Sequence, residues 1–143
     1  MKYVLAALLC FGGAAASAAP ISYNCTFPPS RDGTISGQIT VTVDPDTRRA
    51  AIRDSITQSA VGGAVPARFR QRRNAHFEAS WNVDGVRAGR GGGQLVRWSI
   101  DINPSDNSAV MRARWDRVGD TDESRRPTRA GQCQRVSVPN LLG

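Results

Sequence analysis

The sequence predicts an all-β fold, a single antiparallel β-sandwich or small barrel of six to eight strands whose terminal strands are joined by a disulfide. Apolar and polar residues alternate with a period of two in several short runs, which is typical of strands with one buried face. Turn-forming residues separate these runs at the spacing of sandwiches and barrels. Two cysteines, Cys25 and Cys133, lie far apart near the two ends of the predicted domain.

Residues 1–18 predict a cleaved signal peptide. Lys2 supplies a positive charge, an apolar run covers residues 3–16, and Ala16-Ser17-Ala18 offers the pattern of small residues that precedes a cleavage site. The run is too short and too rich in alanine and glycine for a membrane span, which needs roughly 20 apolar residues. We therefore expect residues 19–143 to form one soluble domain in the periplasm or outside the cell.

Removal of the signal peptide also removes Cys10 and leaves Cys25 and Cys133. An even number of cysteines in an exported protein favours a disulfide, because the compartment is oxidising. Closing a loop of about 100 residues contributes roughly 4–5 kcal/mol in the chain-entropy model. We expect a structural disulfide, and a free nucleophilic or metal-binding thiol is the alternative.

The first regular strand is predicted over residues 35–43, where the odd positions are apolar or glycine and the even positions are polar. Asp44-Pro45-Asp46 then predicts a turn, and a second, less regular strand is expected around residues 50–56. Later strands are predicted at 77–83, 96–102 and 110–115, with turns or loops at 84–85, 89–93 and 103–107. No stretch has a convincing apolar period of 3.6, so no helix is expected.

The three tryptophans, Trp81, Trp98 and Trp115, fall in the middle of three successive predicted strands, on their apolar faces. Pairing these faces places Trp98 opposite Ala79 on one side and opposite Ala113 on the other. A sheet core is commonly filled by placing large side chains opposite small ones. The tryptophans are therefore interpreted as core, and a platform that stacks on a ligand is the alternative.

Residues 118–130 read as a long exposed loop before a last strand that contains Cys133, Val136 and Val138. Long loops on rigid scaffolds often carry function. One hypothesis is therefore a protein-interaction or enzyme-inhibitor module that acts through loops 84–93 and 118–130.

The formal net charge is +7, and it falls to about +6 once Lys2 is removed, because 18 arginines then face 12 acidic residues. Every basic side chain that remains is arginine, whose fork-shaped guanidinium suits phosphate, sulfate and carboxylate groups. The signal peptide argues against intracellular nucleic acid as the partner. The available anions would be polymers and lipid headgroups of the cell envelope.

The arginines are not evenly spread. Arg68, Arg70 and Arg72 share one face of an extended segment, and three more arginines occupy the polar faces of two later strands, where Arg97 is expected opposite Arg114. Glu78 and Asp101 project from the same face as possible counter-charges. This surface is either a solvated, salt-bridged face or an anion-binding patch made of Arg68, Arg70, Arg72, Arg97, Arg112 and Arg114.

Signals for catalysis or metal binding are weak. His76 is the only histidine, and Ser80 would lie about 13 Å from it along a strand, too far for activation of a nucleophile. Two oxygen-rich segments, 101–106 and 120–123, match no defined calcium loop, and the Gly89–Gly93 run lacks the ending of a phosphate loop. We predict no catalytic residues, no metal and no cofactor.

Together these patterns predict an exported, non-enzymatic binding domain of the cell envelope that contacts an anionic ligand through an arginine-rich sheet face. The interaction module described above is the alternative, and a hydrolase is the least favoured class. The partner itself is not identified by the sequence: it would be an anionic envelope polymer or another exported protein.

Overall fold

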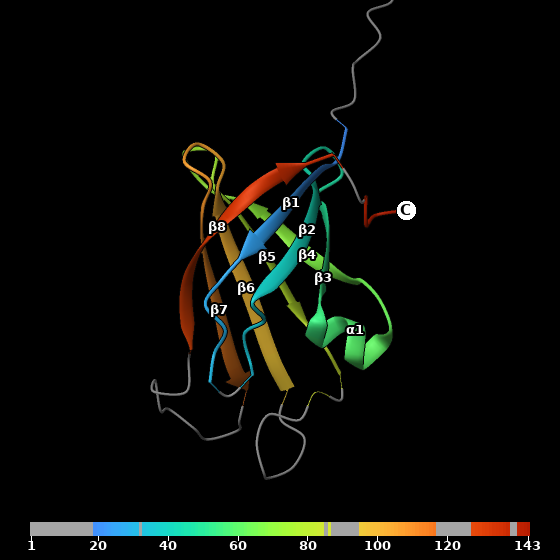
Figure 1. Ribbon diagram of the computed structural model, residues 1–143. Helices are drawn as coiled ribbons and strands as arrows, with labels where there is room; N and C mark the ends of the chain where they lie inside the picture. Colours follow the sequence, from blue (N-terminus) through green and yellow to red (C-terminus); the bar gives the residue numbers. More distant parts are fainter. Residues whose placement is uncertain (1–18, 32, 85, 87–94, 117–126, 138–139) are drawn as a thin grey trace, which may run out of the picture.

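Eight strands and one short helix form a closed barrel in the computed structural model of the protein (Figure 1), which describes residues 19–31, 33–84, 86, 95–116, 127–137 and 140–143. In chain order the elements are β1 (Ile21–Thr26), β2 (Gln38–Asp44), β3 (Arg49–Asp54), α1 (Ser55–Val61), β4 (Val65–Gln71), β5 (Phe77–Asn82), β6 (Leu95–Asn103), β7 (Ser108–Asp116) and β8 (Thr128–Val136).

Every strand pairs antiparallel with its neighbour in sequence, and β8 pairs with β1 to close the sheet. Closure leaves no sheet edge exposed to pairing with another chain. The predicted all-β class and strand number are confirmed, and of the two predicted architectures the structure shows the barrel.

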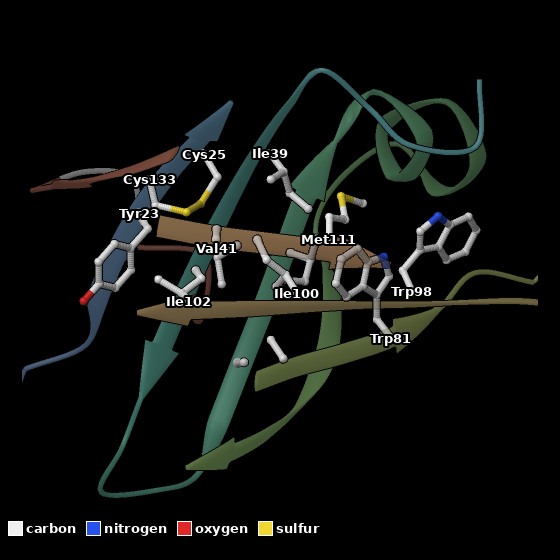
Figure 2. Close-up of a cluster of buried hydrophobic side chains, with 14 of the residues drawn as sticks. Tyr23, Cys25, Ile39, Val41, Trp81, Trp98, Ile100, Ile102, Met111 and Cys133 are labelled. Carbon is white, nitrogen blue, oxygen red and sulfur yellow. A yellow bond between two sulfur atoms is a disulfide. The ribbon is translucent and has the colours of Figure 1, made fainter. Parts of the chain in front are cut away.

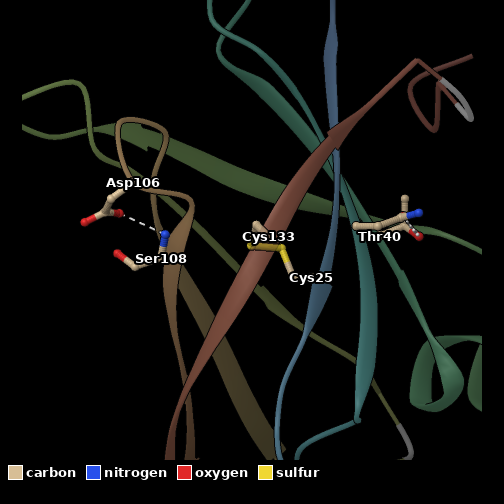
Figure 3. The surroundings of a disulfide bond; sticks show 6 residues. Cys25, Thr40, Asp106, Ser108 and Cys133 are labelled. Atoms are coloured by element: carbon tan, nitrogen blue, oxygen red, sulfur yellow. Dashed lines mark hydrogen bonds between the residues drawn. A yellow bond between two sulfur atoms is a disulfide. The ribbon is translucent and has the colours of Figure 1, made fainter.

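The disulfide fastens the seam at which the barrel closes. Cys25 of β1 lies directly opposite Cys133 of β8 in the strand register, and the two side chains are bonded beneath the sheet (Figure 3). Both cysteines are buried. The predicted link between the first and last strands is therefore confirmed.

Some predicted boundaries were wrong. Ile35 is buried, but β2 begins only at Gln38, because the chain bends at Ile35 and again at Gly37. At the other end of the chain, β8 begins at Thr128, within the segment predicted to be a loop. Its pairing with both β1 and β7 explains the extended backbone there. Val138 lies outside the described residues.

The helix α1 was not predicted, and Ile56, assigned to a strand, lies inside it. Asp54 caps its N-terminus: the Asp54 carboxylate accepts a hydrogen bond from the Thr57 amide, and the Thr57 hydroxyl accepts one from the Asp54 amide. Gly62 ends the helix in the left-handed region, with φ of 74°. Seven residues are too few to show a helical period, so these caps were the available signal.

Large apolar side chains fill the barrel interior. Figure 2 shows Trp81 and Trp98 side by side near one end of the core and Tyr23 near the other. The two indoles are nearly parallel, with ring centroids 6.3 Å apart. Trp98 faces Ala113 as predicted, but it lies opposite Trp81, and Ala79 lies opposite Ile100. The β5–β6 register is thus shifted by two residues, which keeps each residue on its predicted face. The side chain of Trp115 is outside the described part.

Both ends of the interior are covered. Tyr23 and Phe69 pack against Phe77 at one end, with ring centroids 5.4 and 5.9 Å from that of Phe77. At the other end the chain between β1 and β2 folds inward and buries Phe27 and Ile35. Eight-stranded barrels have interiors that side chains can just fill, and the candidate sites considered below therefore lie on the outer surface.

Candidate functional site

The outer surface of β4 to β7 carries the six arginines singled out in the sequence. Arg68 and Arg70 project from β4 and Arg72 follows its last residue, while Arg97 projects from β6 and Arg112 and Arg114 from β7. All six side chains are exposed. The predicted residues thus come from β4, β6, β7 and the residue after β4, and they lie on the outer surface that β4 to β7 share. We call this surface the arginine face.

The strand register orders the arginine face into rows that run across the strands. One row reads Arg68, Ser80, Ser99 and Arg112, from β4 to β7. Adjacent strands are about 4.8 Å apart, so Arg68 and Arg112 are separated by roughly 14 Å at the backbone. The long arginine side chains can bend toward each other over the two serines. This row has two guanidinium groups, two hydroxyl groups and no carboxylate.

The next row, toward the β4–β5 turn, contains the acidic groups. Glu78 lies opposite Asp101 in the register. Glu78 forms an ion pair with Arg72, which raises the pKa of the Arg72 guanidinium above its usual range. The Arg72 Nε is also 3.6 Å from an Asp101 oxygen, and His76 Nδ1 is 3.4 Å from the other. The two carboxylates are therefore engaged with Arg72 and His76.

A third row lies on the other side of the serines. Arg97 of β6 lies opposite Arg114 of β7, as predicted, and opposite Asn82 of β5 on its other side. Like charges directly opposite each other in a sheet repel, at a cost of a few tenths of a kcal/mol or more. Asp101 is four residues along β6 from Arg97, which places it about 13 Å away by the strand rise. The acidic pair is thus better placed to neutralise Arg72 than to neutralise this pair.

Three arginines have no carboxylate partner in the part of the chain that the structure describes: Arg68, Arg70 and Arg112 form no ion pair there. A salt-bridged surface would distribute its acidic groups among the arginines, and Arg70 lies opposite Glu78 in the register, but Glu78 is paired with Arg72. Instead both acids gather at Arg72. The face therefore keeps a local excess of positive charge centred on the row with the serines.

Ser80 and Ser99 were not proposed as site residues from the sequence. Both are half-buried on the outer surface between arginines, and they face each other in the register. The period-two pattern already placed them on the polar face. Their position in one row with Arg68 and Arg112 depends on the β5–β6 register, which the sequence did not predict correctly.

The other motifs have structural explanations or lie outside the described residues. Asn103 and Asp106 shape the β6–β7 turn, where the amide of Ser108 donates to Asp106 at 2.9 Å (Figure 3). The groups at 120–123 and most of loops 84–93 and 118–130 fall in segments that are not described. Among the described side chains no cluster of three histidine, cysteine or acidic residues is arranged to hold a metal ion.

A polar groove of about 470 Å³ lies outside β1 to β3, beside the start of α1. Asp54 is one of the residues that line this groove. Burial raises the pKa of the Asp54 carboxyl, although hydrogen bonds from Thr57 oppose the shift. One Asp54 oxygen, Oδ2, is buried and has no hydrogen-bond partner among the described atoms. We assign this residue to the capping of α1.

No helix in the described part of the chain is long and apolar enough to cross a membrane. Comparison with known proteins gives no relative: no family model matches the chain, and neither a curated protein nor a solved structure is significantly similar to it.

Proposed function

We propose that the protein is an exported, non-enzymatic domain of the cell envelope that binds a ligand carrying phosphate, sulfate or carboxylate groups on its arginine face. One observation carries the proposal. Arg68 and Arg112 flank Ser80 and Ser99 in a row without acidic residues, and neither arginine has an ion-pair partner in the described structure.

The chemistry of this row suits an oxyanion. Guanidinium groups donate charge-assisted hydrogen bonds, which are shorter and stronger than neutral ones. Serine hydroxyls add donors close to the sheet, between the two arginines.

Export is supported by the buried Cys25–Cys133 disulfide, because such bonds persist in oxidising compartments. It is supported further by the charged and apolar composition of residues 1–18. In the periplasm or outside the cell, the arginine face would meet envelope polymers and lipid headgroups rather than intracellular nucleic acid.

The test is binding of residues 19–143 to inorganic polyphosphate, to lipopolysaccharide and to a neutral glucan, each at low and at physiological salt. The site variant is Arg68→Glu/Arg70→Glu/Arg112→Glu, which breaks no ion pair among the described residues. We expect the wild type to bind a phosphate-bearing ligand, to lose affinity steeply as salt rises, and to lose binding in the variant.

A control with the same change in net charge separates the site from general attraction. Arg31, Arg53 and Arg135 are exposed and lie outside the arginine face, so Arg31→Glu/Arg53→Glu/Arg135→Glu should retain most of the affinity. Equal losses in the two variants would reduce the effect to net charge. Absence of binding by the wild type to any anion would refute the proposal.

A further inference from the structure

A second groove, of about 380 Å³, lies on the outside of β3 and β4, where the C-terminal residues of the chain pass over the barrel. The outer side chains at its floor are small: Ala51 of β3 faces Pro66 of β4, and Ala64 precedes β4. Residues of this size leave a hollow, whereas the same strands carry arginines further along. The hollow therefore results from the small outer side chains at these positions.

The C-terminal residues form one wall of this groove. The Leu141 amide donates a hydrogen bond to the Thr42 hydroxyl, with 3.2 Å between the nitrogen and the oxygen, and this bond holds the segment against the outer face of the barrel. Thr42 and Ala51 face outward, yet both are buried. Leu141 and Leu142 line the groove and stay half-exposed, so they present apolar surface on one side of the hollow.

The other side is basic. Arg48, Arg49 and Arg68 line the groove, and all three are exposed. Arg49 and Arg68 face each other in the β3–β4 register, a second like-charge pair. Asp44 lies opposite Arg49 on the β2 side and contributes one negative charge nearby. The side chains that line the groove include three arginines and no carboxylate, which makes this rim positive.

We propose that this groove binds an acyl chain of an anionic lipid whose headgroup lies on the arginine face. The inference rests on the proposed function, and it names the class of ligand. The groove is continuous with the arginine face, because Arg68 belongs both to the rim of the groove and to the row with Ser80, Ser99 and Arg112. An apolar floor next to exposed arginines complements a ligand that has an apolar chain and an anion within one molecule. A purely polar polyanion would leave the apolar wall unused.

The measurement uses soluble, short-chain lipids below their micelle concentrations, titrated into residues 19–143. Phosphatidylglycerol with two butanoyl, hexanoyl or octanoyl chains varies the apolar part, and glycerol phosphate supplies the anion alone. Each methylene that becomes fully buried should increase affinity by up to about fourfold. We expect affinity to rise along the chain series, and phosphatidylcholine of equal chain length to bind much more weakly.

Leu142→Ser removes part of the apolar wall and keeps the backbone hydrogen bonds of the C-terminal residues. It should weaken binding of the octanoyl lipid by about tenfold, which is the loss of affinity expected when part of a buried leucine no longer contacts the chain. Val61→Ser is the matched control, because Val61 is a largely exposed valine on α1 that does not line the groove. Thermal melting of both variants checks that the barrel is folded.

The outcomes separate the two claims. If polyphosphate binds the arginine face, but affinity does not depend on chain length or on Leu142, the lipid inference is wrong and the proposed function stands. If neither the anions nor the lipids bind, both fail. If phosphatidylcholine binds as tightly as phosphatidylglycerol, the groove takes acyl chains without the arginines, and the connection between groove and face is refuted.

Discussion

Trp98 in the barrel core donates its indole Nε1–H to the carbonyl oxygen of Thr34, with 2.8 Å between nitrogen and oxygen. The two residues are 64 positions apart in the sequence. Thr34 lies in the segment between β1 and β2 that folds over the end of the barrel, so this bond fixes the cover to the core. A buried tryptophan usually finds such a partner for its only polar atom.

Trp98→Phe should lower the free energy of unfolding by about 2–4 kcal/mol, because it removes the buried hydrogen bond to the Thr34 carbonyl and part of a filled core. Trp81→Phe is the comparison: Trp81 stacks on Trp98 but donates no hydrogen bond to any described atom. Trp81→Phe should therefore lower the free energy of unfolding by less than Trp98→Phe does. Urea unfolding of both variants measures the difference. Equal losses would show that the hydrogen bond to Thr34 contributes nothing beyond packing.

Gly131 of β8 is enclosed by the end of β1. A Cβ atom at this position would overlap the carbonyl oxygen of Thr26 and the ring of Phe27. Gly131→Ala should therefore destabilise the barrel by about 1–3 kcal/mol, the usual cost of overpacking. At Gly37 the nearest atom to a new Cβ would be 3.7 Å away, so Gly37→Ala should be close to neutral. Thermal unfolding distinguishes the two, and a neutral Gly131→Ala would contradict the close approach of β8 to Thr26.

The β4–β5 turn holds two consecutive non-glycine residues in the left-handed region, Asn74 with φ of 62° and Ala75 with φ of 60°. Alanine disfavours this conformation by roughly 1–2 kcal/mol. Ala75→Gly relieves that cost but gives the unfolded chain more freedom, so we expect a net stabilisation of about 0.5–1 kcal/mol. Ala60→Gly in α1 should instead destabilise, by about 1 kcal/mol. A loss of stability in Ala75→Gly, measured by urea unfolding, would argue against the left-handed turn.

Asp54 predicts an unusual pH dependence. Burial raises the pKa of its carboxyl in the folded state. Its favourable contribution is thus complete below the pKa of the unfolded chain, about 3.8, and is lost as pH rises through the folded value. Asn can also cap the helix, so Asp54→Asn should gain stability relative to the wild type as pH increases from 3 to 7. Paired unfolding curves across this range test it. If the stability difference between Asp54→Asn and the wild type stayed constant with pH, the pKa of Asp54 would not be raised in the folded state.

Alternation along several strands is why the fold class and the buried faces could be predicted from the sequence, and the even cysteine count after removal of residues 1–18 is why the disulfide could be. Alternation also placed Arg97 opposite Arg114, because a short turn joins β6 and β7 and fixes their register. The segment between β5 and β6 is longer, and alternation alone is unchanged by a shift of two residues. The register there was accordingly predicted two residues off.

Because the β5–β6 register was predicted two residues off, the sequence could not predict how the site residues line up across the sheet. The arginines were assigned to the polar face correctly, but their order across the sheet depends on register. Only the structure aligns Arg68 and Arg112 with Ser80 and Ser99 and gathers the acidic residues at Arg72. The groove beside Leu142 depends on how the C-terminus folds back, for which strand periodicity carries no information.

Direct binding of an anion by Arg68 and Arg112 is tested by the salt dependence of polyphosphate binding, measured for wild type and for Arg68→Gln/Arg112→Gln. An arginine that contacts the anion contributes about one to the slope of log affinity against log salt concentration. We predict that the double variant lowers the magnitude of this slope by about two, while Arg31→Gln/Arg53→Gln leaves it almost unchanged. An equal slope for wild type and the Arg68/Arg112 variant would contradict direct binding of the anion by these two arginines.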